Sequence, residues 1–111
     1  MRVLMICKAC VVGIYQRKLE EMARQAQLDL TVLVPSAWRD PSGAQPLERV
    51  YTSGYRLEVV PMCLNGNFHL HFYPTLGRLM RQVRPQLVHI DEEPYNLAAW
   101  QAFCQARRIG A

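Results

Sequence analysis

The feature that most constrains the fold is a change of hydrophobic period along the first third of the chain. Residues Arg2 to Cys7 (RVLMIC) form a continuous apolar run of strand length, and Leu28 to Val34 (LDLTVLV) form a second run that a proline closes. Such runs are typical of strands buried on both faces of a parallel sheet. Between them, Tyr15 to Gln27 has apolar residues at helical spacing: Leu19, Met22, Ala23 and Ala26. The order strand, helix, strand predicts a parallel βαβ unit.

The middle of the chain mixes loop and strand signals. Residues 36–46 (SAWRDPSGAQP) contain two prolines, a glycine and two serines, so we expect a long loop there. YRLEVV, residues 55–60, is the expected third main strand. The segment LERVY before it fits a hairpin partner or a short edge strand.

The last third returns to the alternation of helix and strand. Pro74 suits the first turn of a helix that Pro85 stops, with an apolar stripe of Leu76, Leu79, Met80 and Val83. QLVHID, residues 86–91, is the fourth strand. Pro94 opens a last helix that Gly110 caps, with one face formed by Leu97, Trp100, Gln101 and Cys104.

These elements predict an α/β fold, a Rossmann-like three-layer sandwich with a mostly parallel sheet, over residues 1–111 as one domain. In the doubly wound order 3-2-1-4 the chain reverses direction between the first and fourth strands, and ligands bind at the C-terminal ends of those strands. No strand signal follows the last helix, so we expect the domain to be truncated before its last strands. An uncovered sheet edge also predicts self-association.

Composition narrows the class of function. Thirteen Lys and Arg against nine Asp and Glu give a net charge of +4, too mild for a nucleic-acid tail, so no nucleic-acid partner is expected. The N-terminal apolar run is shorter than a membrane span and has no signal-peptide cleavage site, which predicts a soluble, cytoplasmic protein. Arg78, Arg81 and Arg84 recur on the polar side of a predicted helix. A solvated face is the simpler interpretation of these arginines, and peripheral contact with anionic lipid is the alternative.

Two segments carry the candidate site. The acidic block Asp91, Glu92 and Glu93 holds more charge than a helix N-terminus needs, which suggests binding of sugar hydroxyls or work on a proton. Solvated helix-start charges are the alternative. In the loop after the first strand, Gly13 either begins a helix or lets a ligand approach the backbone, where Lys8 and helix-end amides would meet an anionic group. A single glycine does not make a classical NAD or FAD site.

The four cysteines are expected to be reduced. Cys7 and Cys10 form a CxxC motif, but Cys7 ends a predicted buried strand instead of opening a helix, and two further zinc ligands are not evident. We therefore do not predict a redox or metal site at this motif. Cys63 and Cys104 are expected in the core.

The histidines give weaker signals. His69 and His71 would share a face of an extended segment and would then offer imidazoles to a metal or an oxyanion, whereas an exposed loop is the simpler interpretation. His89 is expected to be a core histidine that hydrogen-bonds to the backbone. No metal site is predicted from the three histidines.

The segments MRVLMIC with its glycine-containing loop, PQLVHIDEEP and YNLAAWQAFCQARRIGA resemble the N-terminal domain of GT-B glycosyltransferases of family 4. This retaining group includes phosphatidylinositol mannosyltransferases and sucrose synthases. The resemblance covers nearly the whole chain in element order, and PQLVHIDEEP is its specific motif. In the family two Rossmann-like domains face each other across a cleft. The N-terminal domain mainly holds the acceptor, and the C-terminal domain, absent from this chain, holds the nucleotide sugar.

The resemblance also implies roles for single residues. Gly13 matches the loop glycine near the donor diphosphate, and Glu93 with Pro94 matches the family's Glu-Pro. The family often has a histidine just before that Glu, where this chain has Asp91 and Glu92. The residues expected to take part in catalysis are Asp91, Glu92 and Glu93. Those expected to bind donor or acceptor are Lys8, Gly13, His71, Glu92 and Glu93.

The leading hypothesis is thus the acceptor-side domain of a retaining glycosyltransferase that moves a sugar from a nucleotide-diphosphate donor to a hydroxyl acceptor. Such an enzyme requires no metal or other cofactor, and this half alone should be inactive. The alternative is a stand-alone Rossmann-like binding module that pairs with a separately encoded catalytic partner. A flavodoxin-like regulatory domain is the third hypothesis, and the lack of an acid at the end of the first strand argues against it.

Overall fold

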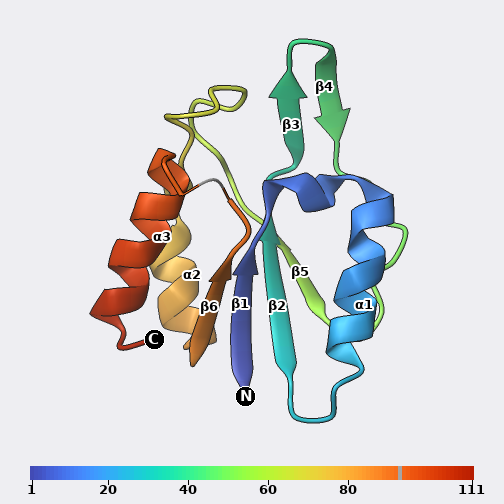
Figure 1. Ribbon diagram of the computed structural model, residues 1–111, viewed down its shortest axis with the longest axis vertical. Coiled ribbons are helices and arrows are strands. Elements are labelled where there is room, and N and C mark those ends of the chain that lie inside the picture. The colour runs from blue at the N-terminus through green and yellow to red at the C-terminus, as the bar shows by residue number, and fades with distance from the viewer. Residues whose placement is uncertain (93) are drawn as a thin grey trace.

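A parallel four-stranded sheet forms the centre of the chain, in a computed structural model that describes residues 1–92 and 94–111 (Figure 1). The strands are β1 (Arg2–Ile6), β2 (Asp29–Val34), β5 (Arg56–Val59) and β6 (Leu87–Ile90). Their order is β5-β2-β1-β6, and all three neighbouring pairs are parallel. This order confirms the predicted arrangement 3-2-1-4. The chain therefore reverses direction between β1 and β6, where the predicted site lies.

Helices cover both faces of the sheet and make three layers (Figure 1). Helix α1 (Arg17–Ala23) lies on one face, and α2 (Leu76–Val83) and α3 (Leu97–Arg108) lie on the other. The α/β fold and its three-layer arrangement are thus as predicted. No helix in the described part of the chain combines the length and the apolar character that a membrane crossing requires.

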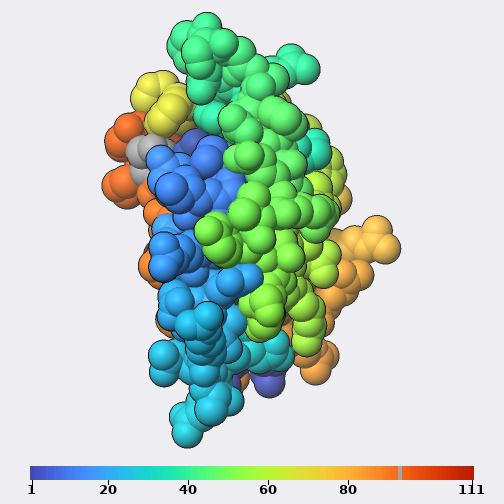
Figure 2. Space-filling model, turned by 90° about the vertical axis from the view of Figure 1, so that its right-hand side faces the viewer, coloured from blue at the N-terminus to red at the C-terminus, as the bar shows by residue number. Residues whose placement is uncertain are grey.

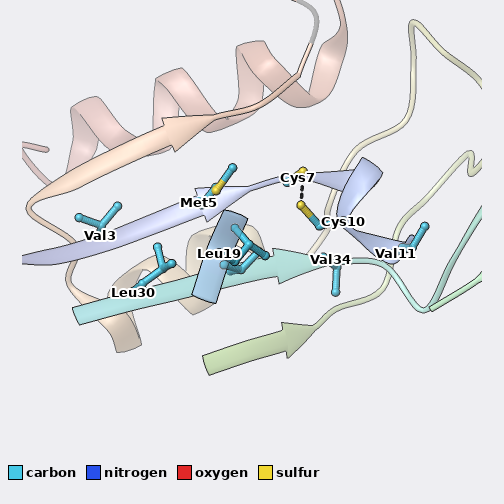
Figure 3. Packing of buried hydrophobic residues seen from close by; sticks show 9 residues of the cluster. Val3, Met5, Cys7, Cys10, Val11, Leu19, Leu30 and Val34 are labelled. Atoms are coloured by element: carbon cyan, nitrogen blue, oxygen red, sulfur yellow. Dashed lines mark hydrogen bonds between the residues drawn. The ribbon is translucent and has the colours of Figure 1, made fainter. Parts of the chain in front are cut away.

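Alternate residues of the buried strands supply two separate cores. Val3 and Met5 of β1 point to the α1 side, where Leu19 is fully buried (Figure 3). Leu4 and Ile6 point to the other side and pack against α2 and α3. Each fully buried leucine or isoleucine stabilises the fold by about 1.5–3 kcal/mol, so apolar residues on both sides fix the strand in the middle of the sheet. This double burial is the reason that β1 has no polar alternation.

The first helical region is more irregular than its period predicts. Two short 3-10 helices, η1 (Lys8–Val11) and η2 (Gly13–Gln16), come before α1. The α-helix then ends at Ala23, and Ala26 of the predicted stripe is exposed. The Gln16 side chain is fully buried, and its amide donates to the carbonyls of Cys10 and Glu48. These bonds hold the irregular backbone of the two short helices in place.

Residues 36–46 form a hairpin, so the prediction of a loop there is wrong. Strands β3 (Ala37–Asp40) and β4 (Gly43–Pro46) pair antiparallel and project beyond the C-terminal end of the sheet (Figure 1). The Asp40 carboxylate accepts hydrogen bonds from the Ser42 amide and hydroxyl at 2.8 and 2.5 Å and so closes the turn. The turn-forming residues are concentrated at the tip, and the short strands have no apolar alternation that would reveal them.

The segment after the hairpin runs along α1 and covers that side of the molecule (Figure 2). LERVY, residues 47–51, is not a strand; the Gln16 side-chain oxygen accepts from the amides of Val50 and Tyr51 at 3.1 and 3.2 Å. Farther along, the Ser53 amide donates to Glu20 of α1 at 2.8 Å. Side chains of the first helical region therefore replace the sheet partner that this segment lacks.

Helix α3 does not bury the face that its large residues form. The buried residues are Ala98, Ala99 and Ala102, whereas Trp100 is 63% exposed. Small residues let α3 approach α2 and β6 closely, and the described residues contain no strand beyond β6 to cover the opposite side. The C-terminal cap is as predicted, because Gly110 has a φ of 76° just after the helix.

Candidate functional site

The candidate site lies where β1 and β6 end side by side. The two strands pair in parallel with Ile6 opposite Ile90, and the Asp91 amide donates to the Ile6 carbonyl at 2.9 Å. Lys8 follows β1, and Asp91 and Glu92 follow β6. The topology thus joins the two segments that the sequence identified. Glu93 lies outside the described residues.

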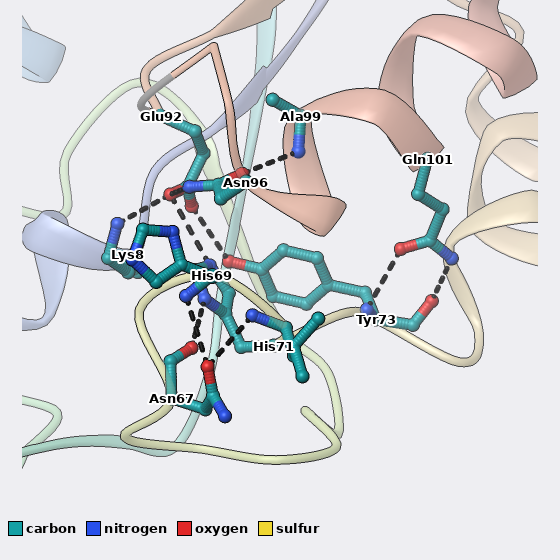
Figure 4. A network of polar contacts seen from close by, with 10 residues as sticks. Lys8, Asn67, His69, His71, Tyr73, Glu92, Asn96, Ala99 and Gln101 are labelled. Carbon is teal, nitrogen blue, oxygen red and sulfur yellow. Dashed lines mark hydrogen bonds and ion pairs between the residues drawn. The ribbon is translucent and has the colours of Figure 1, made fainter.

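The Glu92 carboxylate is the centre of a buried polar network (Figure 4). Its side chain is fully buried, and the Lys8 ammonium lies 2.6 Å from Oε2. The Tyr73 hydroxyl donates to Oε1 at 3.3 Å, and the Asn96 amide donates to Oε2 at 3.4 Å. The His71 Nε2 atom lies 3.5 Å from the same Oε2. The alternative interpretation of the acidic block, solvated charges at a helix start, is therefore wrong for Glu92.

The network keeps Glu92 ionised. Burial acts to raise the pKa of the Glu92 carboxyl, but the contacts with His71 and Lys8 outweigh it and hold the pKa below its ordinary value of 4.5. Burial and the charge of Glu92 raise the pKa of Tyr73 well above its ordinary value. Tyr73 is therefore a neutral phenol that donates to a carboxylate. Both groups are fixed in one protonation state near pH 7, which suits positioning rather than proton transfer.

His71 is buried, so the simpler prediction of an exposed loop is wrong for this histidine, although it is right for His69. Its Nδ1 lies 2.8 Å from the Asn67 carbonyl, and its Nε2 makes no hydrogen bond within the described residues. Both ring nitrogens face acceptors, the Asn67 carbonyl and the Glu92 carboxylate. The Asn67 side chain shapes this turn by accepting from the amides of His69 and Leu70 at 3.1 and 3.0 Å.

Two aromatic residues that the sequence analysis missed cover Lys8. The ammonium lies 5.2 Å from the ring centroid of Trp38 and 4.9 Å from that of Phe68. Trp38 comes from β3 and also meets His71 edge to face, with ring centroids 5.0 Å apart. Trp38 lies in the segment that was predicted to be a loop. An aromatic residue among turn-forming residues was the only sign in the sequence that Trp38 belongs to the site.

An open pocket of about 430 Å³ lies beside this network, lined by Lys8, Ala9, Trp38, Phe68, Asp91 and Glu92. Aromatic walls with a few polar groups are typical of small-molecule sites. A larger pocket of about 520 Å³ lies at the other end of the sheet and is lined mainly by the arginines Arg2, Arg81 and Arg84 with apolar neighbours. Among the described residues, no acidic or aromatic side chain lines this larger pocket. We therefore place the candidate site at the smaller pocket.

Asp91 is the solvent-facing acid of the site. Its side chain is 41% exposed, and its Oδ2 lies 3.2 Å from the Lys18 ammonium and 3.3 Å from the Cys7 sulfur. Partial burial acts to raise the pKa of Asp91, but the bonds from Cys7 and Lys18 outweigh it and lower the pKa. Asp91 is therefore a carboxylate that can accept hydrogen bonds from a ligand in the pocket.

Gly13 has a packing role that the sequence did not reveal. It begins η2, as one of the two interpretations predicted, but its amide donates to the Glu48 carboxylate at 2.9 Å. A Cβ atom at this position would lie 2.4 Å from the Val50 side chain. Protein atoms therefore occupy the space through which a diphosphate was expected to approach the Gly13 backbone.

The remaining predicted residues lie elsewhere. His89 is exposed, so the prediction of a core histidine is wrong; β6 is an edge strand and its side chain points away from the cores. Cys63 and Cys104 are half-buried instead of fully buried. Asn96, which the sequence analysis missed, caps α3 by accepting from the Ala99 amide at 2.8 Å, and its place just before an apolar helix was a usable signal.

Among residues 1–92 and 94–111, no group of three or more His, Cys, Asp or Glu side chains is arranged to hold a metal ion. Comparisons of the chain with known protein families, with curated proteins and with solved structures gave no match.

Proposed function

We propose that this chain is the acceptor-side domain of a retaining glycosyltransferase, which moves a sugar from a nucleotide-diphosphate donor to a hydroxyl acceptor in the cytoplasm. The observation that carries the proposal is the pocket at the ends of β1 and β6, with Trp38 and Phe68 beside Lys8 and Asp91. In open α/β sheets this reversal point is where ligands bind. The resemblance of PQLVHIDEEP to family 4 enzymes supports an acceptor in the same region.

The pocket chemistry suits a polyhydroxylated ring. Trp38 and Phe68 line the pocket with apolar surface for the C–H groups of a sugar or cyclitol, and the exposed Asp91 carboxylate accepts from its hydroxyls. The Glu92 carboxylate already contacts Lys8 and His71, so we assign it to positioning these two side chains beside the pocket. Fixing the acceptor hydroxyl in this way is the contribution of one half of a two-domain cleft.

The donor should bind weakly to this half alone. The Lys8 ammonium is paired with Glu92 at 2.6 Å, and the Gly13 amide is taken by Glu48 at 2.9 Å. Few groups are therefore left on this side for a diphosphate. A separate donor-binding domain would supply the remaining cations and amides.

Ligand-observed NMR on the 111-residue protein tests the proposal. Monosaccharides, methyl glycosides and inositol form the acceptor panel, and nucleoside diphosphates form the donor panel. We expect saturation transfer to at least one polyol, with a dissociation constant that Trp38→Ala and Asp91→Asn each raise about ten-fold, as loss of one good contact does. Arg81→Ala, in the pocket at the other end of the sheet, is the control and should leave the dissociation constant of the polyol unchanged.

Two results would contradict the proposal. One is the absence of saturation transfer to every polyol, or equal transfer in Trp38→Ala. The other is tight binding of a nucleotide-sugar donor, or sugar transfer by residues 1–111 alone, because half a cleft cannot orient both substrates.

The second candidate, a stand-alone binding module with a separately encoded partner, is favoured by the outer face of α3. Trp100 and Phe103 stack there with ring centroids 6.1 Å apart and are 63% and 49% exposed. Exposed aromatic surface of this kind often marks a protein interface. Sedimentation analysis separates the candidates, because a module of this kind should form a stable complex with its partner that Trp100→Ser weakens, while polyol binding stays unchanged.

A further inference from the structure

The fold brings two thiols into contact beside the candidate site. Cys7 follows β1, Cys10 lies in η1, and their sulfur atoms are 2.6 Å apart (Figure 3). Both residues are fully buried, and both are free cysteines. A disulfide needs sulfur atoms about 2.05 Å apart, so only a small movement within η1 separates this pair from bond formation.

The argument against a redox pair, that Cys7 ends a strand instead of opening a helix, does not hold in the structure. Cys7 ends the buried run, as predicted, but it is also the N-cap residue of η1, so the motif does open a helical turn. Cys7 and Cys10 are three residues apart across this turn, which brings their two sulfur atoms into contact.

The surroundings make the two thiols chemically different. The hydrogen bond to Cys10, together with burial, raises the pKa of Cys7. The close contact with Cys7, aided by the charge of Lys18, outweighs burial and lowers the pKa of Cys10. Cys10 is thus the better nucleophile, and Cys7 is positioned to resolve the product.

We propose that Cys7 and Cys10 are a redox-active dithiol that hydrogen peroxide converts to an intrachain disulfide. The Cys10 thiolate attacks one peroxide oxygen; an S–O bond forms, the O–O bond breaks, and water leaves after taking up a proton. The Cys7 sulfur then attacks the Cys10 sulfenic acid, so that an S–S bond forms and a second water leaves with the Cys7 proton. Two electrons pass from the thiols to the peroxide, and a thiol reductant returns them. Because both sulfurs are buried, a small oxidant fits this pair better than a protein disulfide.

Oxidation would act directly on the candidate site. Cys7 contacts the Asp91 carboxylate at 3.3 Å, and its thiol proton is lost in the disulfide. Lys8, the cation that pairs with Glu92, stands between the two cysteines in the chain and so becomes part of the closed ring. The redox state of the pair is therefore linked to both acids of the site.

Trypsin makes the test direct, because it cleaves after Lys8 between the two cysteines. The reduced protein is treated with hydrogen peroxide, alkylated under denaturing conditions and digested without reductant. In reduced protein, residues 3–8 and 9–17 are separate peptides, each with an alkylated cysteine. After oxidation we expect one cross-linked species of the two peptides, with the loss of two hydrogens and both alkyl groups, while Cys63 and Cys104 stay alkylated. Dithiothreitol should restore both peptides.

Matched variants sharpen the result. A Cys63→Ser/Cys104→Ser variant should form the cross-link as the unmodified protein does, and Cys10→Ser should lose it and leave Cys7 fully alkylated. The proposal is overturned if Cys63 and Cys104 are oxidised while Cys7 and Cys10 remain alkylatable. It is equally overturned if Cys7 or Cys10 links to another cysteine instead.

Discussion

Lys8 and Glu92 stand 84 residues apart in the chain and form a 2.6 Å ion pair in which the carboxylate is fully buried. The pair connects η1, which follows β1, to the segment that follows β6. Removing one partner of a buried pair is costly, because the other charge is left without compensation. This pair is therefore a structural element of the site as well as part of its chemistry.

Glu92→Gln should lower the free energy of unfolding by about 3 kcal/mol, because Lys8 and His71 lose the charge that they face. A surface acid at a helix start would contribute less than about 1 kcal/mol. Urea unfolding followed by circular dichroism measures the change. Glu21→Gln is the matched control, since its pair with Arg24 is exposed and should contribute less than about 1 kcal/mol. Equal losses in the two variants would contradict the burial of Glu92.

Acid should destabilise the protein through the same carboxylate. The pKa of Glu92 in the folded protein lies below its ordinary value of 4.5, so the unfolded chain binds the proton more readily. The contribution of Glu92 is therefore complete above about pH 4.5 and is lost as the pH falls through the folded pKa. Urea unfolding at several pH values should show a stability difference between the protein and Glu92→Gln that shrinks on acidification. A difference independent of pH would show that packing, not charge, is lost in the variant.

Gly13→Ala should destabilise the fold by about 1–3 kcal/mol, because the new Cβ overlaps the Val50 side chain at 2.4 Å. Val50→Ala in the same chain should recover much of that loss by removing the contacted methyl groups. The control is Gly77→Ala within α2, where the Cβ meets the flexible end of Gln105 at 3.1 Å and alanine is a better helix former. Thermal unfolding of the four proteins measures the effects, and an unaltered Gly13→Ala melting temperature would disprove the close packing.

Trp100→Ser should change association more than stability. The indole is 63% exposed, so its removal should alter the free energy of unfolding by less than about 0.5 kcal/mol. If the outer face of α3 mediates self-association, the variant should sediment as a monomer at concentrations where the unmodified protein does not. It should also bind less of an apolar dye. An unmodified protein that is strictly monomeric and binds no dye would argue against this surface as an interface.

The sequence identified the two polar segments of the candidate site and one of its histidines, His71. The acidic block after the fourth strand and the loop after the first strand were visible as residue types at strand ends, and the 3-2-1-4 order placed them together. The contacts of Tyr73 and His71 with Glu92, and of Trp38 with Lys8, were not predictable, because these residues come from a hairpin and from a segment whose course depends on side-chain hydrogen bonds. Asp40 closes the hairpin and Asn67 shapes the turn.

By itself, the sequence determined the parallel α/β core. Apolar runs such as Arg2 to Cys7 are buried on both faces wherever they pack, and the residues Pro85 and Gly110 end helices for local steric reasons. Only the tertiary structure decided that Glu92 is buried, that the Val50 side chain packs closely against Gly13, and that the sulfur atoms of Cys7 and Cys10 are in contact. Periodicity depends on the average environment of a whole element, whereas these contacts depend on the one partner that each side chain meets when distant segments come together.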